Sequence, residues 1–149
     1  MRRCLPILII FVVLSVSSCS FINNFVVINA SGNVVEVSYT LKRWTGLTPR
    51  TLPSSQLGKQ IGWQELPASR YTIDQDNKRI VLQLNAGEAL LVDQCRPANG
   101  QSAGDCESDE FSVQRIAIVG SVGKIALEGE QAQRAFVFDR NHSYTLTYK

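Results

Sequence analysis

The stretch Val35-Glu36-Val37-Ser38-Tyr39-Thr40-Leu41 decides the fold of this chain. Apolar side chains at 35, 37, 39 and 41 alternate with polar side chains at 36, 38 and 40. Successive side chains of a strand point to opposite faces of its sheet, so this pattern predicts a strand with one buried and one solvated face.

Other short apolar or alternating segments surround this strand, separated by turn residues. They cover residues 25–28, 71–73, 80–84, 89–92, 111–119, 124–127, 135–138 and 143–148. The turn residues at 29–33 predict a hairpin between 25–28 and 35–41, and those at 74–78 predict a second hairpin. No segment has a sustained apolar period of 3.6 residues. About eight or nine short strands predict an all-β fold, an antiparallel β-sandwich (Ig-like or similar), with a small β-barrel as the second choice.

The N-terminus has the features of a secretory signal. Arg2 and Arg3 precede an apolar run over residues 5–16, and Val16-Ser17-Ser18-Cys19 follows it. The run is shorter than the roughly 20 residues that a membrane-spanning helix needs. Val16-Ser17-Ser18-Cys19 resembles the lipobox of bacterial lipoproteins, in which the precursor is cleaved before the cysteine and the cysteine is acylated. An ordinary signal peptide cleaved near Ser18 is the alternative.

The resemblance implies a division of the chain and a location. Residues 1–18 would be the signal peptide, residues 19–24 the lipidated N-terminus and a short tether, and residues 25–149 a single β-sandwich domain. Fatty chains such as palmitate on Cys19 would hold the protein on a membrane of the bacterial cell envelope, at about 0.8 kcal/mol per buried methylene. In lipoproteins of enteric-type bacteria an aspartate after the cysteine often marks retention at the inner membrane, so Ser20 favours the outer membrane, facing the periplasm.

The charge of the chain gives no reason to expect a nucleic-acid partner. Fifteen Lys and Arg stand against thirteen Asp and Glu. Arg2 and Arg3 leave with the signal peptide, so the remaining domain has thirteen charges of each sign. A neutral domain without a basic stripe lacks the electrostatic attraction that nucleic-acid binding depends on.

Two cysteines remain in the predicted domain, Cys95 and Cys106, and they enclose a polar stretch. Disulfides persist outside the cytoplasm, and closing this loop would stabilise the fold by about 3 kcal/mol. A redox or metal pair is the alternative, but the spacing is not Cys-x-x-Cys and no histidine lies nearby. Four acidic residues surround Cys106: Asp105, Glu107, Asp109 and Glu110. They form either a solvated loop or a docking surface for a basic partner.

Residues 43–70 interrupt the pattern of strands. This segment is rich in proline and glycine and contains Trp44 and Trp63, with little alternation. One interpretation is a crossover between two sheets, with the tryptophans covering the end of the sandwich. The other is a functional loop, in which Trp44 and Trp63 would stack on a sugar or an aromatic compound.

Catalytic and metal-binding patterns are weak. His142 is the only histidine and lies in a predicted turn. Residues 120–124 are similar to a phosphate-binding loop, but the glycines are too close and Ile125 stands where Ser or Thr is needed, so a hairpin turn is expected. Asp74, Asp76 and Asn77 are interpreted as turn residues rather than calcium ligands. The sequence thus predicts no catalytic residue, metal ligand or cofactor.

We therefore expect a lipid-anchored envelope protein, not an enzyme, that acts as a binding or structural module and most readily binds another protein. One alternative is an inhibitor of a basic hydrolase such as lysozyme, acting through the acidic 95–106 loop. The other is a binder of a small sugar or aromatic ligand that uses Trp44 and Trp63.

Overall fold

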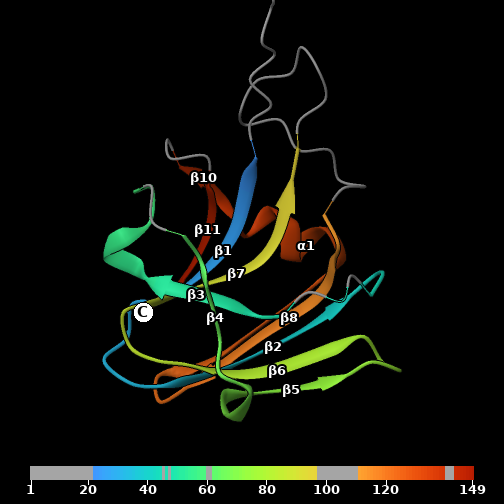
Figure 1. Ribbon diagram of the computed structural model, residues 1–149, viewed down its shortest axis with the longest axis horizontal. Helices are drawn as coiled ribbons and strands as arrows, with labels where there is room; N and C mark the ends of the chain where they lie inside the picture. The colour runs from blue at the N-terminus through green and yellow to red at the C-terminus, as the bar shows by residue number, and fades with distance from the viewer. Residues whose placement is uncertain (1–21, 45, 47, 60–61, 97–110, 140–142) are drawn as a thin grey trace, which may run out of the picture.

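The structure is a computed structural model that describes residues 22–44, 46, 48–59, 62–96, 111–139 and 143–149 (Figure 1). Its strands are β1 (Asn23–Asn29), β2 (Val35–Leu41), β3 (Arg50–Pro53), β4 (Gln64–Glu65), β5 (Tyr71–Asp74), β6 (Arg79–Leu84), β7 (Glu88–Cys95), β8 (Val113–Gly120), β9 (Gly123–Glu128), β10 (Val137–Asp139) and β11 (Ser143–Tyr148). Two 3₁₀ helices, η1 (Ser54–Gln56) and η2 (Ala68–Arg70), and one α-helix, α1 (Gly129–Arg134), lie between them.

The strands form two sheets that pack against each other. One sheet has six strands in the order β10-β11-β1-β7-β3-β4, and the other has five in the order β5-β6-β2-β8-β9. β1 and β11 run parallel, while the other described strand pairs are antiparallel. Because each sheet ends in edge strands, the two do not close into a barrel. The predicted β-sandwich is confirmed, and the barrel alternative is wrong.

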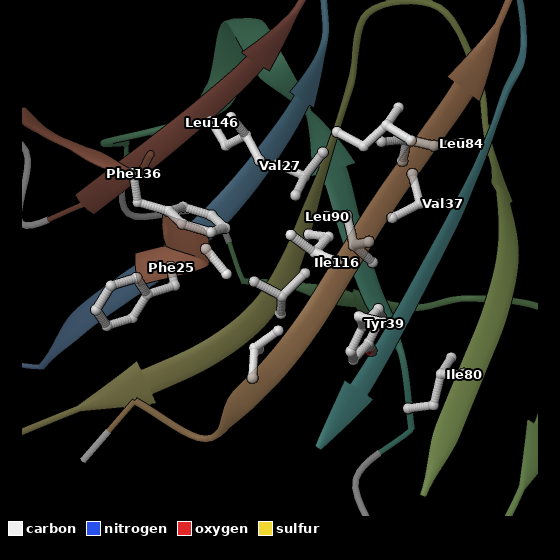
Figure 2. Packing of buried hydrophobic residues seen from close by; sticks show 14 of the residues in the cluster. Phe25, Val27, Val37, Tyr39, Ile80, Leu84, Leu90, Ile116, Phe136 and Leu146 are labelled. Atoms are coloured by element: carbon white, nitrogen blue, oxygen red, sulfur yellow. The ribbon is translucent and has the colours of Figure 1, made fainter. Parts of the chain in front are cut away.

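The inner faces of the sheets meet in one apolar core (Figure 2). Val37 and Tyr39 of β2 point into it, while Glu36, which precedes Val37, faces solvent, as the alternation predicts. Phe25 of β1 faces them from the other sheet and stacks on Tyr144, with ring centroids 4.7 Å apart. Each fully buried side chain of this size contributes about 1.5–3 kcal/mol, so the core supplies the main favourable term of folding.

The connection between β1 and β2 is not the predicted hairpin. β1 pairs with β7 and β11, whereas β2 pairs with β6 and β8, so residues 30–34 cross from one sheet to the other. The buried Asn29 side chain holds this crossing: its Nδ2 donates to the carbonyl oxygens of Asn33 (2.8 Å) and Leu84 (3.0 Å). Its Oδ1 accepts from the backbone N–H of Ser31 at 3.1 Å. The prediction failed because turn residues signal a change of direction, but not the sheet in which the next strand pairs.

The chain crosses between the sheets again from β6 to β7, where an ion pair holds it. The Arg70 guanidinium donates to both carboxylate oxygens of Glu88 (3.0 and 2.5 Å) and to the Gln83 carbonyl (2.9 Å). Partial burial acts to raise the pKa of Glu88, but hydrogen bonds from Arg70 and Asn85 outweigh it and the pKa is lowered. The stabilisation is therefore present above the ordinary glutamate pKa and is lost as the pH falls through the lowered value.

The segment 43–70 crosses between the sheets as expected, but it also contributes two strands that the sequence did not predict. β3 and β4 extend the six-stranded sheet beyond β7. Leu52 and Leu57 pack with Trp63 on the outer face of this sheet, against Val26 and Ala89. The strands were missed because they are only four and two residues long, too short for alternation to show.

The last third of the chain follows the prediction with one addition. Strands predicted at 111–119, 124–127 and 143–148 are β8, β9 and β11, but the strand predicted at 135–138 begins only at Val137. The six-residue helix α1 precedes it and was missed, because a helix that buries only Ala132 leaves no apolar period. At the other end of the chain, β1 begins at Asn23, so the predicted tether overlaps the first strand.

Residues 120–123 form the predicted hairpin turn between β8 and β9, with Gly120 paired to Gly123. The hydroxyl of Tyr148, from the other sheet, donates to the Gly123 carbonyl at 2.9 Å. A Cβ atom on Gly120 would lie 2.7 Å from this hydroxyl and 2.8 Å from Cγ1 of Val35. Gly120 therefore permits the close approach of the two sheets.

Replacing Asn29 by alanine should lower the free energy of unfolding by about 1–3 kcal/mol, because the buried carbonyls of the crossing lose their donor. Urea denaturation measures the loss. The exposed Asn33→Ala variant is the matched control, since the Asn33 side chain donates to the exposed Ser121 hydroxyl at 3.1 Å and not to a buried carbonyl of the described residues. Equal effects of the two variants would contradict the role assigned to Asn29.

The variant Gly120→Ala should be destabilised by about 1–3 kcal/mol, because the added methyl group forces Tyr148 or Val35 to move. Gly32→Ala is the control, since a Cβ there meets nothing within 4 Å. Thermal unfolding of both variants tests the packing, and a neutral Gly120→Ala variant would rule out the close contact.

Candidate functional site

One end of the sandwich brings together segments that are distant in the sequence. Asn23, the first residue of β1, pairs with Cys95, the last residue of β7. Asn24 pairs with Ser143, the first residue of β11. The start of β1 and the end of β7 lie side by side at the top of Figure 1. We call this region, defined by Asn23, Cys95 and Ser143, the anchor end, because the predicted lipidation site Cys19 precedes β1 by four residues.

A β-bulge near the anchor end turns an aspartate inward. Phe25 pairs with Asp93 and Val26 pairs with Leu91, so Val92 is an extra residue in β7. Val92 packs in the core, and strict alternation would then point Asp93 outward. The bulge re-aims the side chain. Asp93 instead lines a cavity between the two sheets.

The Asp93 carboxylate joins two parts of the chain. Its Oδ2 accepts from the backbone N–H of Ser112 at 2.6 Å, and its Oδ1 accepts from that of Gln94 at 2.9 Å. Burial raises the pKa of Asp93, although these hydrogen bonds and the charge of Lys42 act in the opposite direction. Gln94 and Ser112 lie on either side of residues 97–110. Asp93 thus fixes the chain where it enters and leaves that segment.

The cavity beside Asp93 is small, and both polar and apolar side chains line it. Tyr39, Thr48 and Arg50 line it together with Asp93 and Ser112. Burial, and then the negative charge of Asp93, raise the pKa of the Tyr39 phenol. The volume is about 40 Å³, whereas ligand sites usually measure roughly 300–1,000 Å³. This cavity matches a few water molecules rather than a sugar ring.

Sequence reasoning missed Asp93. The residue ends the apolar run Ala89-Leu90-Leu91-Val92, where an aspartate is expected to mark the end of a buried strand. A carboxylate directly after such a run was a signal, but the bulge that buries it depends on pairing with β1.

The predicted acidic loop is only partly described. Cys95 is buried at the end of β7, with 3 % of its surface exposed. Cys106 and the acidic residues Asp105, Glu107, Asp109 and Glu110 lie outside the described residues, so the disulfide stays a prediction. Cys19 and His142 also lie outside the described residues.

The structure does not bring the two tryptophans together. Trp44 is half-buried and packs against the core between the sheets. Trp63 is also half-buried, but it packs with Ile28 and Leu57 on the outer face of the six-stranded sheet. Each indole covers a different apolar cluster.

Asp74 and its neighbours form the predicted turn between β5 and β6. The Asp74 carboxylate accepts from the side chain of Asn77 (2.7 Å) and from its backbone N–H (3.0 Å), and these bonds lower the pKa of Asp74. Across the described ranges, no group of three or more His, Cys, Asp or Glu residues is placed to hold a metal ion.

The outer face of the five-stranded sheet is a second open surface. Small side chains align across it, with Ser38 opposite Ala117 and Ala117 opposite Ala126. Arg79 and Arg115 flank this row from neighbouring strands and border a surface depression. Sequence reasoning missed this arrangement, because only the register of four strands aligns these residues.

Comparisons with known proteins find no match for this chain: no family model, no curated protein and no solved structure is similar to it. Within the ranges that the structure describes, none of the helices has the length and apolar character to cross a membrane.

The raised pKa of Asp93 predicts a pH dependence of stability. The folded protein binds this proton more tightly than the unfolded chain does, so the stability that Asp93 contributes is greatest below the ordinary aspartate pKa of about 3.9. This contribution falls as the pH rises through the pKa that Asp93 has in the folded protein. Relative to Asp93→Asn, the wild type should therefore lose free energy of unfolding between the unfolded and the folded pKa of Asp93, and the difference should be constant at higher pH.

Chemical denaturation of both proteins at a series of pH values measures this difference. Asp93→Asn also loses one acceptor for the Ser112 or Gln94 N–H, which shifts the whole curve by about 1–3 kcal/mol without changing its slope. If the free energy of unfolding of the wild type instead rose with pH relative to that of Asp93→Asn, the hydrogen bonds to Asp93 would outweigh its burial and the prediction would be wrong.

Proposed function

We propose that this chain is a lipoprotein of the bacterial envelope, anchored through Cys19, whose domain is a non-catalytic binding module for another protein. In this proposal residues 1–18 are removed and the domain faces the periplasm from the outer membrane. The lipobox-like stretch Val16-Ser17-Ser18-Cys19 supports the anchor.

The register at the anchor end is the observation that carries the proposal. Cys19 precedes Asn23, the first residue of β1, by four residues, so the two lie at most about 14 Å apart. A lipid on Cys19 would therefore hold Asn23, Cys95 and Ser143 close to the membrane surface. The opposite end of the sandwich, with the crossings at 30–34 and 85–87, would face away from it.

Two features favour binding over chemistry. The cavity at Asp93 is too small for most substrates, while the outer face of the five-stranded sheet presents Arg79, Arg115 and Lys124 to solvent. Polar, solvated surfaces of this kind meet partners through charge complementarity.

The inhibitor of a basic hydrolase is a second candidate. The Asp93 carboxylate supports it, because it accepts from the backbone N–H groups of Ser112 at 2.6 Å and Gln94 at 2.9 Å and so holds these two residues close together. This clamp, together with the proposed disulfide between Cys95 and Cys106, would present the acidic segment as a loop with a fixed base. Neutralising Asp105, Glu107, Asp109 and Glu110 to their amides should abolish salt-sensitive binding to a basic hydrolase such as lysozyme. Unchanged affinity would remove this candidate.

The lipid anchor is tested by labelling cells with a palmitate analogue. Wild-type protein should incorporate the label and fractionate with membranes, whereas Cys19→Ser should lose both properties. Cys4→Ser is the matched control, because it changes another cysteine of the same leader and should keep the label. Labelling of Cys19→Ser would contradict the assignment.

The binding function is tested by crosslinking full-length protein in cells, followed by mass spectrometry. A partner protein captured by the wild type but not by the mislocalised Cys19→Ala variant is the expected result. Crosslinks should fall on residues 43–70, 95–110 or the outer face of the five-stranded sheet. Absence of a specific partner would count against a protein-binding module.

A further inference from the structure

The four sheet edges of the sandwich differ in length. The edge strands β4, β10 and β5 have two, three and four residues, whereas β9 has six. Proteins commonly keep edge strands short, because an open edge presents unpaired backbone groups to other chains. In the part of the chain that the structure describes, β9 pairs only with β8 and offers the longest open edge.

The backbone groups of β9 that face this edge follow from its pairing. β9 is in continuous antiparallel register with β8, from Gly123 opposite Gly120 to Glu128 opposite Arg115. The two-residue turn makes Gly120 and Gly123 a hydrogen-bonded pair, and such pairs alternate with pairs that exchange no bonds. The N–H and C=O groups of Lys124, Ala126 and Glu128 therefore point away from β8.

The sequence of this edge is complementary to itself. In an antiparallel arrangement centred on Ala126, Lys124 lies opposite Glu128 of the partner subunit. Ile125 then lies opposite Leu127 of the partner subunit. We propose that β9 pairs with β9 of a second copy of this chain about a two-fold axis at Ala126, which joins two five-stranded sheets into one.

The pairing would form backbone hydrogen bonds, bring opposite charges together and cover apolar side chains. Lys124, Ala126 and Glu128 present the backbone groups, so the three pairs would exchange about six hydrogen bonds. Glu128 already forms an ion pair with Arg115, whose Nη2 lies 2.6 Å from Oε1 of Glu128. Lys124 of the partner subunit would approach the same exposed carboxylate. Ile125 and Leu127 are half-buried at the edge, and a facing strand would cover them.

Other registers fit less well. After a shift of one residue, residues whose backbone N–H and C=O groups point away from β8 would lie opposite residues whose backbone groups point toward β8. The two strands could then not form a continuous ladder of hydrogen bonds. A shift of two residues keeps the ladder but moves Lys124 away from Glu128 of the partner subunit. The arrangement centred on Ala126 thus combines the full overlap with opposite charges at both ends.

Disulfide trapping tests the two-fold axis in the full-length protein in its own membranes. Ala126→Cys should form a crosslinked dimer under mild oxidation, because paired Cα atoms lie about 5.5 Å apart, within the range of a disulfide. Ala117→Cys is the matched control: it lies on the same face, opposite Ala126 on β8, but away from the edge. Equal trapping of both variants, or of neither, would overturn the proposal.

A charge exchange tests the register. Lys124→Glu and Glu128→Lys should each weaken the dimer about tenfold, because like charges then face each other at both ends. The double variant should recover the wild-type dimer. Sedimentation velocity of detergent-solubilised full-length protein measures the dimer over a range of concentrations. Wild-type protein that stays monomeric, or a double variant that fails to recover, would refute pairing through β9.

Discussion

The fold depends on how the chain leaves one sheet and enters the other without exposing unsatisfied backbone groups. Asn29 satisfies backbone groups at the first crossing, because its buried side-chain amide donates to the carbonyl oxygens of Asn33 and of Leu84 in the opposite sheet. Two further sets of hydrogen bonds lie at the same end. The Arg70 guanidinium donates to the Gln83 carbonyl and to the Glu88 carboxylate, and the Tyr148 hydroxyl donates to the Gly123 carbonyl. With both sheets fastened there, the core residues of β1, β2 and β7 face one another along their length.

The anchor end is built differently, since a strand of each sheet carries a bulge there. Bulges at Val92 in β7 and at Gln114 in β8 both fall near it. The first turns Asp93 inward, and the carboxylate then takes the backbone donors of Gln94 and Ser112. Sheets commonly carry bulges where a side chain must be re-aimed. The result is a base for residues 97–110 beside the start of β1.

The proposed lipid anchor and the proposed β9 pairing concern different parts of the molecule, and neither requires the other. They would nevertheless reinforce each other physically. Anchoring confines copies to a surface and raises their effective concentration, so even a short strand pairing would be populated there. The outer face of the five-stranded sheet would then continue across the two-fold axis, doubling the row that runs through Ser38, Ala117 and Ala126.

The sequence by itself determined the class of the fold, the hairpins at 74–78 and 120–123 and most strand positions, because alternation and turn chemistry are local properties. It also supplied the stretch Val16-Ser17-Ser18-Cys19, on which the proposed lipid anchor rests. Only the tertiary structure decided that residues 30–34 form a crossing, that β3 and β4 join the six-stranded sheet, and that Asp93 faces inward. It also placed Trp44 and Trp63 apart and left β9 as the long edge. These features depend on which strands become neighbours, and that is set by pairing between residues far apart in the chain, which no local pattern records.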